Sequence, residues 1–188
     1  AVPSVIAAPQ PTFAQSGTER MITRKAYDAL HRLTSISHSN SPLGLFDAYR
    51  YAYNTANQRT AVTNAENSWW QYGYDALGQV TAGKKYWSDS TLVAGQQFEY
   101  TYDDIGNRKT AASGGDQWGA NLRYENYTAN NLNQYTARTV PGAVDVLGAA
   151  NSNATVTVNL LPTSRKGDYF RAEVPAANSS TPAYTGLT

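Results

Sequence analysis

The sequence predicts an all-β chain, because aromatic residues recur at every second position and a short tyrosine-containing motif is repeated along the chain. The alternating rings are Tyr49, Tyr51 and Tyr53, then Trp70, Tyr72 and Tyr74, then Phe98, Tyr100 and Tyr102. A period of two places such side chains on one face of a β-strand. We find no helical spacing of apolar residues over stretches longer than about ten residues.

The composition fits a folded chain whose buried surface comes largely from rings. The 188 residues include 14 Tyr and 4 Trp, and each large aromatic side chain buries on the order of 150–250 Å². Fifteen Lys and Arg balance 14 Asp and Glu, and there is no Cys. No apolar run approaches the roughly 20 residues of a transmembrane helix. We therefore expect no nucleic-acid partner, no membrane span and no thiolate metal site.

Five segments in the middle of the chain align without gaps: KAYDALHRLTS, YAYNTANQRTA, YGYDALGQVTA, YTYDDIGNRKT and YTANNLNQYTA. Their shared anchor position holds Tyr27, Tyr53, Tyr74, Tyr102 and Ala129. Two residues before the anchor stand Lys25, Tyr51, Tyr72, Tyr100 and Tyr127. Directly after it stand Asp28, Asn54, Asp75, Asp103 and Asn130. The fourth position after it holds His31, Asn57, Gly78, Gly106 and Asn133.

These columns predict that each segment is a β-hairpin around a five-residue turn. An Asp or Asn side chain can bond the backbone two residues further on, and Gly or Asn best tolerates the left-handed conformation that closes such a turn. His31 is the one residue that fits this position poorly. Residues 59–62 and 80–82 are expected as second arms, and residues 37–45 and 83–94 as connecting loops.

The composition changes after Val140, where tyrosines become rare. Residues 154–159 are expected to form one strand, and residues 166–171 a turn that leads into another. The predicted organisation is a linker or extended segment over residues 1–20, five hairpins over 21–138, and a smaller β segment with a flexible tail over 139–188.

The repeated unit, Tyr-Asp-x-x-Gly-x with a second Tyr two residues earlier, resembles the YD repeat of the RHS/YD-repeat proteins, a family that includes bacterial toxin-complex shells and the teneurin shell. The resemblance covers about residues 23–138, and the segment that follows resembles a small β insertion of some bacterial members. It implies a curved sheet that is part of a hollow β-shell, a secreted or cell-surface location, and either an enclosed toxin polypeptide or a scaffold role. Implied partners are further YD-repeat chain or a second copy, paired through sheet edges.

The pattern of the titratable residues favours structural roles over catalytic or metal-binding ones. Asp28, Asp75 and Asp103 recur at one turn position, whereas acid–base catalysis needs two differently tuned carboxyls in one cleft. The stretch 103–107 lacks the ligand pattern of a calcium loop. His31 and His38 show no metal-binding spacing and are expected as surface or turn residues. No residue matches the family's self-cleaving segment, so we expect no enzyme, metal or cofactor.

The aromatic stripe leaves a second hypothesis open. Its recurrence in every unit favours a structural role in cross-strand packing. Exposed rings can also stack on sugars, and Trp69, Trp87 and Trp118 lie off the shared columns. These three are the candidates for a ligand contact, and a secreted carbohydrate-binding or adhesive module is the alternative function.

Overall fold

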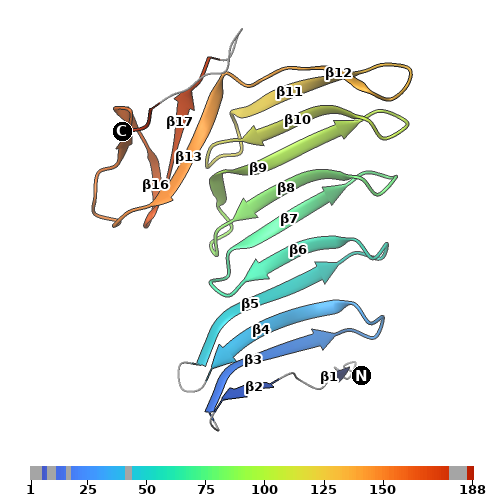
Figure 1. Ribbon diagram of the computed structural model, residues 1–188, viewed down its shortest axis with the longest axis vertical. Coiled ribbons are helices and arrows are strands. Elements are labelled where there is room, and N and C mark those ends of the chain that lie inside the picture. The colour runs from blue at the N-terminus through green and yellow to red at the C-terminus, as the bar shows by residue number, and fades with distance from the viewer. Residues whose placement is uncertain (1–5, 8–11, 16–17, 41–43, 178–185) are drawn as a thin grey trace. The chain divides into compact units, whose positions relative to one another are not determined.

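The computed structural model describes residues 6–7, 12–15, 18–40, 44–177 and 186–188, and every regular element in these ranges is a β-strand (Figure 1). The predicted all-β class is confirmed. None of the described residues forms a helix that is long and apolar enough to cross a membrane. The chain divides into two compact units: unit 1 holds residues 1–73 and 85–90, and unit 2 holds residues 74–84 and 91–188.

Unit 1 is a series of antiparallel strands that pair in sequence order. The strands are β1 (Ile6–Ala7), β2 (Thr12–Gln15), β3 (Thr18–Tyr27), β4 (Leu33–Asn40), β5 (Gly44–Tyr53), β6 (Arg59–Asn64) and β7 (Trp69–Tyr74, as far as Gly73 in this unit). Strands β3 to β7 follow one another, and β1 and β2 both pair with β3. Tyr51 stands opposite Val62, which stands opposite Trp70. The alternating rings therefore share one face with aliphatic partners, as the period of two predicts.

Strands extend further than the sequence predicted. Residues 1–20, expected as a linker or an extended segment, include β1, β2 and the start of β3. The loops expected over 37–45 and 83–94 were wrong in extent. Strands occupy residues up to Asn40 and from Gly44 in the first, and residues up to Tyr86 and from Leu92 in the second. These extensions were not predicted because their side chains are largely polar and lack an apolar alternation. Strand pairing satisfies the backbone hydrogen-bonding groups whatever the side chain is.

Unit 2 continues the hairpin pattern. Its repeat strands are β8 (Val80–Tyr86, as far as Lys84 in this unit), β9 (Leu92–Tyr102), β10 (Arg108–Gly114), β11 (Leu122–Ala129) and β12 (Tyr135–Arg138), and they follow one another in this order. Tyr102 pairs with Arg108 but Thr101 with Thr110, so Lys109 forms a β-bulge just after the turn. The register shifts at the same place in three other hairpins. The hairpins thus share their irregularity as well as their turn.

The C-terminal residues of unit 2 form two small sheets. One has the order β13 (Ala143–Ala149), β17 (Tyr169–Pro175), β16 (Ser164–Lys166), and the other pairs β14 (Thr157–Val158) with β15 (Leu161–Pro162). Val158, Ala172 and Val174 form their buried core, with Val146 and Phe170 packed against it.

The C-terminal predictions fare differently. The turn expected within 166–171 is confirmed, since Gly167 has a φ of 56° between β16 and β17. The strand expected over 154–159 is reduced to Thr157–Val158, because Asn159 and Leu160 adopt positive φ in a tight turn. The expected flexible tail falls largely on residues 178–185, outside the described residues.

Candidate functional site

The five repeat turns share one backbone geometry. The N–H of the opening Asp or Asn donates to the carbonyl four residues later, and the N–H three residues later donates back to the opening carbonyl, at 2.9–3.1 Å. The residue at that third place has positive φ in every turn: His31 60°, Asn57 63°, Gly78 84°, Gly106 91° and Asn133 60°. His31 therefore takes the left-handed conformation despite its poor fit.

The opening side chain explains why this column is Asp or Asn. In all five turns its Oδ1 accepts the N–H groups two and four residues later, at 2.7–3.1 Å. These two bonds stabilise the chain reversal, and both are accepted by the side chain of the residue that opens the turn. The repeated carboxylates Asp28, Asp75 and Asp103 are thus engaged as turn acceptors.

The other polar atom of the opening side chain bonds the side chain four residues later, a position that the sequence prediction did not include. Asp28 Oδ2 accepts from Arg32 Nε at 2.7 Å, and Asp103 Oδ2 accepts from Asn107 Nδ2 at 2.9 Å. Where the opening residue is Asn54, its Nδ2 donates instead to Gln58 Oε1 at 2.6 Å. Each carboxylate thus faces a donor and each amide faces an amide; Gln serves Asp75 as well as Asn54, because a side-chain amide can donate or accept.

Tyrosine hydroxyls join two of the hairpins to the ones before them. Tyr53 Oη donates to the Leu33 carbonyl at 2.8 Å, and Tyr102 Oη donates to the Val80 carbonyl at 2.9 Å. Both carbonyls belong to the fifth residue after the Asp that opens the preceding turn. The anchor hydroxyl thus acts as a tie between neighbouring hairpins.

The tyrosines two places before the anchor pack against arginines. The guanidinium of Arg59 lies over the Tyr51 ring at 4.4 Å, and that of Arg108 lies over Tyr100 at 4.9 Å. Arg108 also lies 5.8 Å from the Tyr127 ring. Such cation–π contacts are worth about 0.5–1 kcal/mol at exposed sites, so this column stabilises the sheet. Tyr72, in the same column, stacks parallel to Trp70 at 6.4 Å.

Hydrogen bonding tunes the turn carboxyls. The Arg32 N–H is the largest cause that holds the pKa of Asp28 below its ordinary value, and the Asn107 side chain is the largest cause that lowers the pKa of Asp103. A lowered pKa favours the ionised form, which is the form that accepts these bonds. The shift is opposite to that of a general acid poised near neutral pH.

Two further turns of the same geometry were missed in the sequence. Asn64 opens a turn that Asn67 (φ 62°) closes, and Asp116 opens one that Gly119 (φ 86°) closes. Asp116 Oδ1 accepts the N–H groups of Trp118 and Ala120. The signal was an Asx followed three residues later by Asn or Gly, without the preceding Tyr that the repeat template requires.

The three candidate tryptophans differ in surroundings. Trp69 stacks on Tyr86 in unit 1, with ring centroids 4.4 Å apart and planes 15° apart. Trp87 is half-buried directly after β8, where its carbonyl accepts the Ser90 N–H at 2.9 Å. Trp118 in unit 2 is 78% exposed at the tip of its turn. Of the three, Trp118 offers the most open ring.

The histidines and carboxylates that the structure describes form no metal-binding group. Among the described residues, no set of three or more His, Cys, Asp or Glu side chains could hold a metal ion. His31 is an exposed turn residue, as expected. His38 is a half-buried residue of β4 rather than a surface or turn residue: its Nδ1 hydrogen-bonds Thr23 Oγ1 at 3.0 Å and its ring stacks on Phe46.

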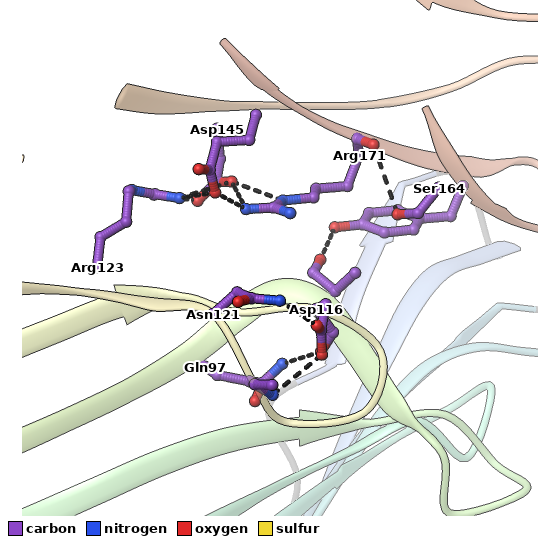
Figure 2. Close-up of polar contacts among 11 residues, drawn as sticks. Gln97, Asp116, Asn121, Arg123, Asp145, Ser164 and Arg171 are labelled. Carbon is purple, nitrogen blue, oxygen red and sulfur yellow. Dashed lines mark hydrogen bonds and ion pairs between the residues drawn. The ribbon is translucent and has the colours of Figure 1, made fainter. Parts of the chain in front are cut away.

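An ionic network in unit 2 links the C-terminal sheet to β11 (Figure 2). Asp145 from β13 pairs with Arg123 of β11 and accepts from Arg171 Nε of β17 at 2.7 Å. Glu173 accepts from Arg123 Nη1 at 2.7 Å and also pairs with Arg171. Burial opposes the charge on Arg123, but the bonds to Asp145 and Glu173 outweigh it and raise its pKa. Two arginines and two carboxylates thereby neutralise one another.

Close backbone approach completes this junction. Tyr169 Oη donates to the Ala94 carbonyl at 2.5 Å, and burial raises the pKa of Tyr169 to about 12. A Cβ on Gly95 would lie 2.7 Å from Leu147 Cδ2, and Gly95 has a φ of 80°, so any other residue there would be strained. Nearby, the fully buried Gln97 donates to the Asp116 carbonyl at 2.5 Å. The C-terminal sheet thus packs against the ends of β9 and β11.

Comparison with known proteins shows similarity in structure. No family model matches the chain, and neither does any curated protein. The crystal structure of TcdB2-TccC3-Cdc42 matches with a TM-score of 0.54 and 15% identity over 90% of this chain. That of TcdB2-TccC3-TEV matches with a TM-score of 0.51 and 16% identity over 85% of it. The match spans 8% of the length of either solved chain. At this identity the likeness shows a shared fold, and the resemblance to RHS/YD-repeat toxin complexes is confirmed at that level.

Proposed function

We propose that this chain is a non-enzymatic wall element of an RHS/YD-repeat protein, in which hairpins add laterally to form a β-shell or an extracellular scaffold. The observation that carries the proposal is the repeated tie between hairpins. The same hydroxyl position of one hairpin reaches the same backbone position of the one before it, as Tyr53 does with Leu33 and Tyr102 with Val80. A device that recurs along the repeat is suited to building an extended wall.

The finer parts of the proposal rest on the RHS/YD-repeat fold. We place the protein outside the cell, as a secreted bacterial protein, and assign a toxin polypeptide as the cargo of a closed shell. The matched solved chains belong to a toxin complex and are much longer than this one. Further YD-repeat chain, or a second copy, would then pair with the outer edge of β12, the last strand of the repeat order among the described residues.

Concentration-dependent hydrogen exchange tests the wall hypothesis. All residues of β12 are exposed, and unpaired strand edges tend to pair with further strands. Raising the protein concentration should slow amide exchange within residues 135–138, in step with association seen by sedimentation. An exposed stretch away from the edge, residues 151–155, serves as the internal control. A chain that stays monomeric, with the β12 exchange rate unchanged at every concentration, would contradict the proposal.

The carbohydrate-binding alternative keeps one supporting observation, the open ring of Trp118. Glycan-array screening of the wild-type chain and of Trp118→Ala would test it. Saturable binding that is lost in Trp118→Ala but kept in Trp87→Ala would favour the lectin-like hypothesis. Since Trp118 is 78% exposed, its removal should leave the fold intact, so lost binding could be attributed to the ring. Absence of glycan binding would leave the wall as the better interpretation.

A further inference from the structure

The repeat turns of unit 2 expose a large apolar side chain at one recurring position. The residue two places after the opening Asp or Asn is Leu77, Ile105 or Leu132, and these side chains are 73%, 70% and 76% exposed. This place in a type I turn is compatible with most residues. Neither turn geometry nor core packing therefore accounts for an aliphatic residue in all three turns.

The three turns lie side by side, so these side chains form one row. Gln79 of the first turn reaches Gly106 of the second, since a Cβ on Gly106 would lie 3.4 Å from Gln79 Oε1. Asn107 Nδ2 of the second donates to Asn133 Oδ1 of the third at 3.3 Å. Successive turns are separated by two strands, which is about 10 Å. Exposed apolar groups gathered in this way mark interaction sites, and we call Leu77, Ile105 and Leu132 the tip row.

The charge within the three turns of the tip row is negative. The turns 75–79, 103–107 and 130–134 contain Asp75, Asp103 and Asp104 and no Lys or Arg. Asp104 is exposed, and the other two are half-buried. A second copy of the same row would bring like charges together, which disfavours the row as a contact between copies. A basic partner is complementary instead.

The spacing fits a helix. Residues i and i+7 of an α-helix lie about 10.5 Å apart on one face, close to the estimated separation of successive turns. A heptad pattern would thus set an apolar group beside each member of the row, as in helix-in-groove recognition. The row spans about 20 Å, or about 14 helical residues. We propose that the tip row of unit 2 binds a basic amphipathic helix of a partner protein, with leucine-like side chains against the row and Lys or Arg beside the aspartates.

A synthetic peptide of about 20 residues, with Leu in heptad positions flanked by Lys, is the probe. Fluorescence anisotropy would compare its affinity for the wild-type chain and for the triple variant Leu77→Ser, Ile105→Ser, Leu132→Ser. We expect the triple variant to bind roughly tenfold more weakly or worse. Leu30→Ser is the matched control, because Leu30 holds the same turn position in unit 1 beside the basic Arg32 and should leave the affinity unchanged.

A second arm needs only the wild-type chain. A peptide with Glu in place of every Lys should lose binding, and a peptide with the same residues in scrambled order should bind less. Equal binding of the Glu and Lys peptides, undiminished binding by a folded triple variant, or no binding of the Lys peptide to the wild-type chain would each overturn the proposal. Self-association of the wild-type chain that the triple variant abolishes would also overturn it, in favour of a second copy.

Discussion

Gly95→Ala tests whether the C-terminal sheet is seated on β9 as the structure has it. Gly95 lies within β9 with a φ of 80°, and its N–H donates to the Gly115 carbonyl at 2.8 Å. A Cβ there would lie 2.7 Å from Leu147 Cδ2 and 3.2 Å from Arg171 Cγ. Alanine at this position would thus meet two side chains of the C-terminal sheet as well as an unfavourable backbone conformation.

The two penalties can be estimated separately. A left-handed conformation costs a non-glycine residue about 1–2 kcal/mol. Overpacking typically adds about 1–3 kcal/mol; the lower half applies to Leu147, whose terminal methyl can rotate away, while Arg171 is held by Asp145. We therefore expect Gly95→Ala to lower the free energy of unfolding by about 2–4 kcal/mol.

Urea unfolding of three alanine variants would separate the contributions. Gly167 has a φ of 56°, and a Cβ added to it would meet nothing within 4 Å, so Gly167→Ala should show the backbone cost alone. Gly142 has open space and no positive φ, so Gly142→Ala should be nearly neutral. Equal destabilisation by Gly95→Ala and Gly167→Ala would refute the close packing of Leu147 and Arg171 on β9.

Three further outcomes are expected. Asp103→Asn should leave stability at pH 7 nearly unchanged, because Asn54 opens an equivalent turn. It should make stability less dependent on acid pH, since the lowered pKa of Asp103 contributes stability that is present above about pH 4 and lost as the pH falls through its folded value. Unfolding midpoints between pH 7 and 2 would show this difference. Tyr135→Phe should lose about 1 kcal/mol, because Tyr135 Oη accepts the Arg108 N–H at 2.7 Å, whereas a midpoint unchanged in urea would show the bond to be immaterial. Asp145→Ala should cost about 2–4 kcal/mol in thermal or urea unfolding, since it leaves Arg123 and Arg171 to share the more exposed Glu173; a neutral result would contradict the network.

The repeat turns could be predicted because their chemistry is local. One Asp or Asn side chain bonds backbone groups two and four residues away, and one later residue takes positive φ, so five consecutive residues contain the whole motif. The turns opened by Asn64 and Asp116 make the same pair of backbone bonds. They were missed because the repeat was recognised by its tyrosines, which belong to the strand and are not needed by the turn.

The junction with the C-terminal sheet could not be predicted, because its contacts join residues far apart in the chain. Arg123 bonds partners 22 and 50 residues away, and Tyr169 reaches a carbonyl 75 residues away. The sequence next to a charged residue or a glycine does not indicate which distant residue it will contact. Gly95 interrupts an otherwise regular strand pattern, and the reason for it appears only when Leu147 and Arg171 are placed beside it.

The fifth repeat shows what the tyrosine column requires. Its anchor is Ala129, which has no hydroxyl to reach the preceding hairpin. Tyr135, from the opposite arm and paired with Ala129, brings its hydroxyl to Arg108, the fifth residue after the Asp that opens the preceding turn. There it accepts the backbone N–H, whereas the anchor hydroxyls of Tyr53 and Tyr102 donate to the carbonyl at the equivalent place. A hydroxyl can do either, so the repeat preserves a polar tie at one backbone position while the residue that supplies it changes. By sequence alignment alone, Ala129 would indicate that the anchor tyrosine is lost, yet the hydrogen bond between the hairpins is kept by Tyr135.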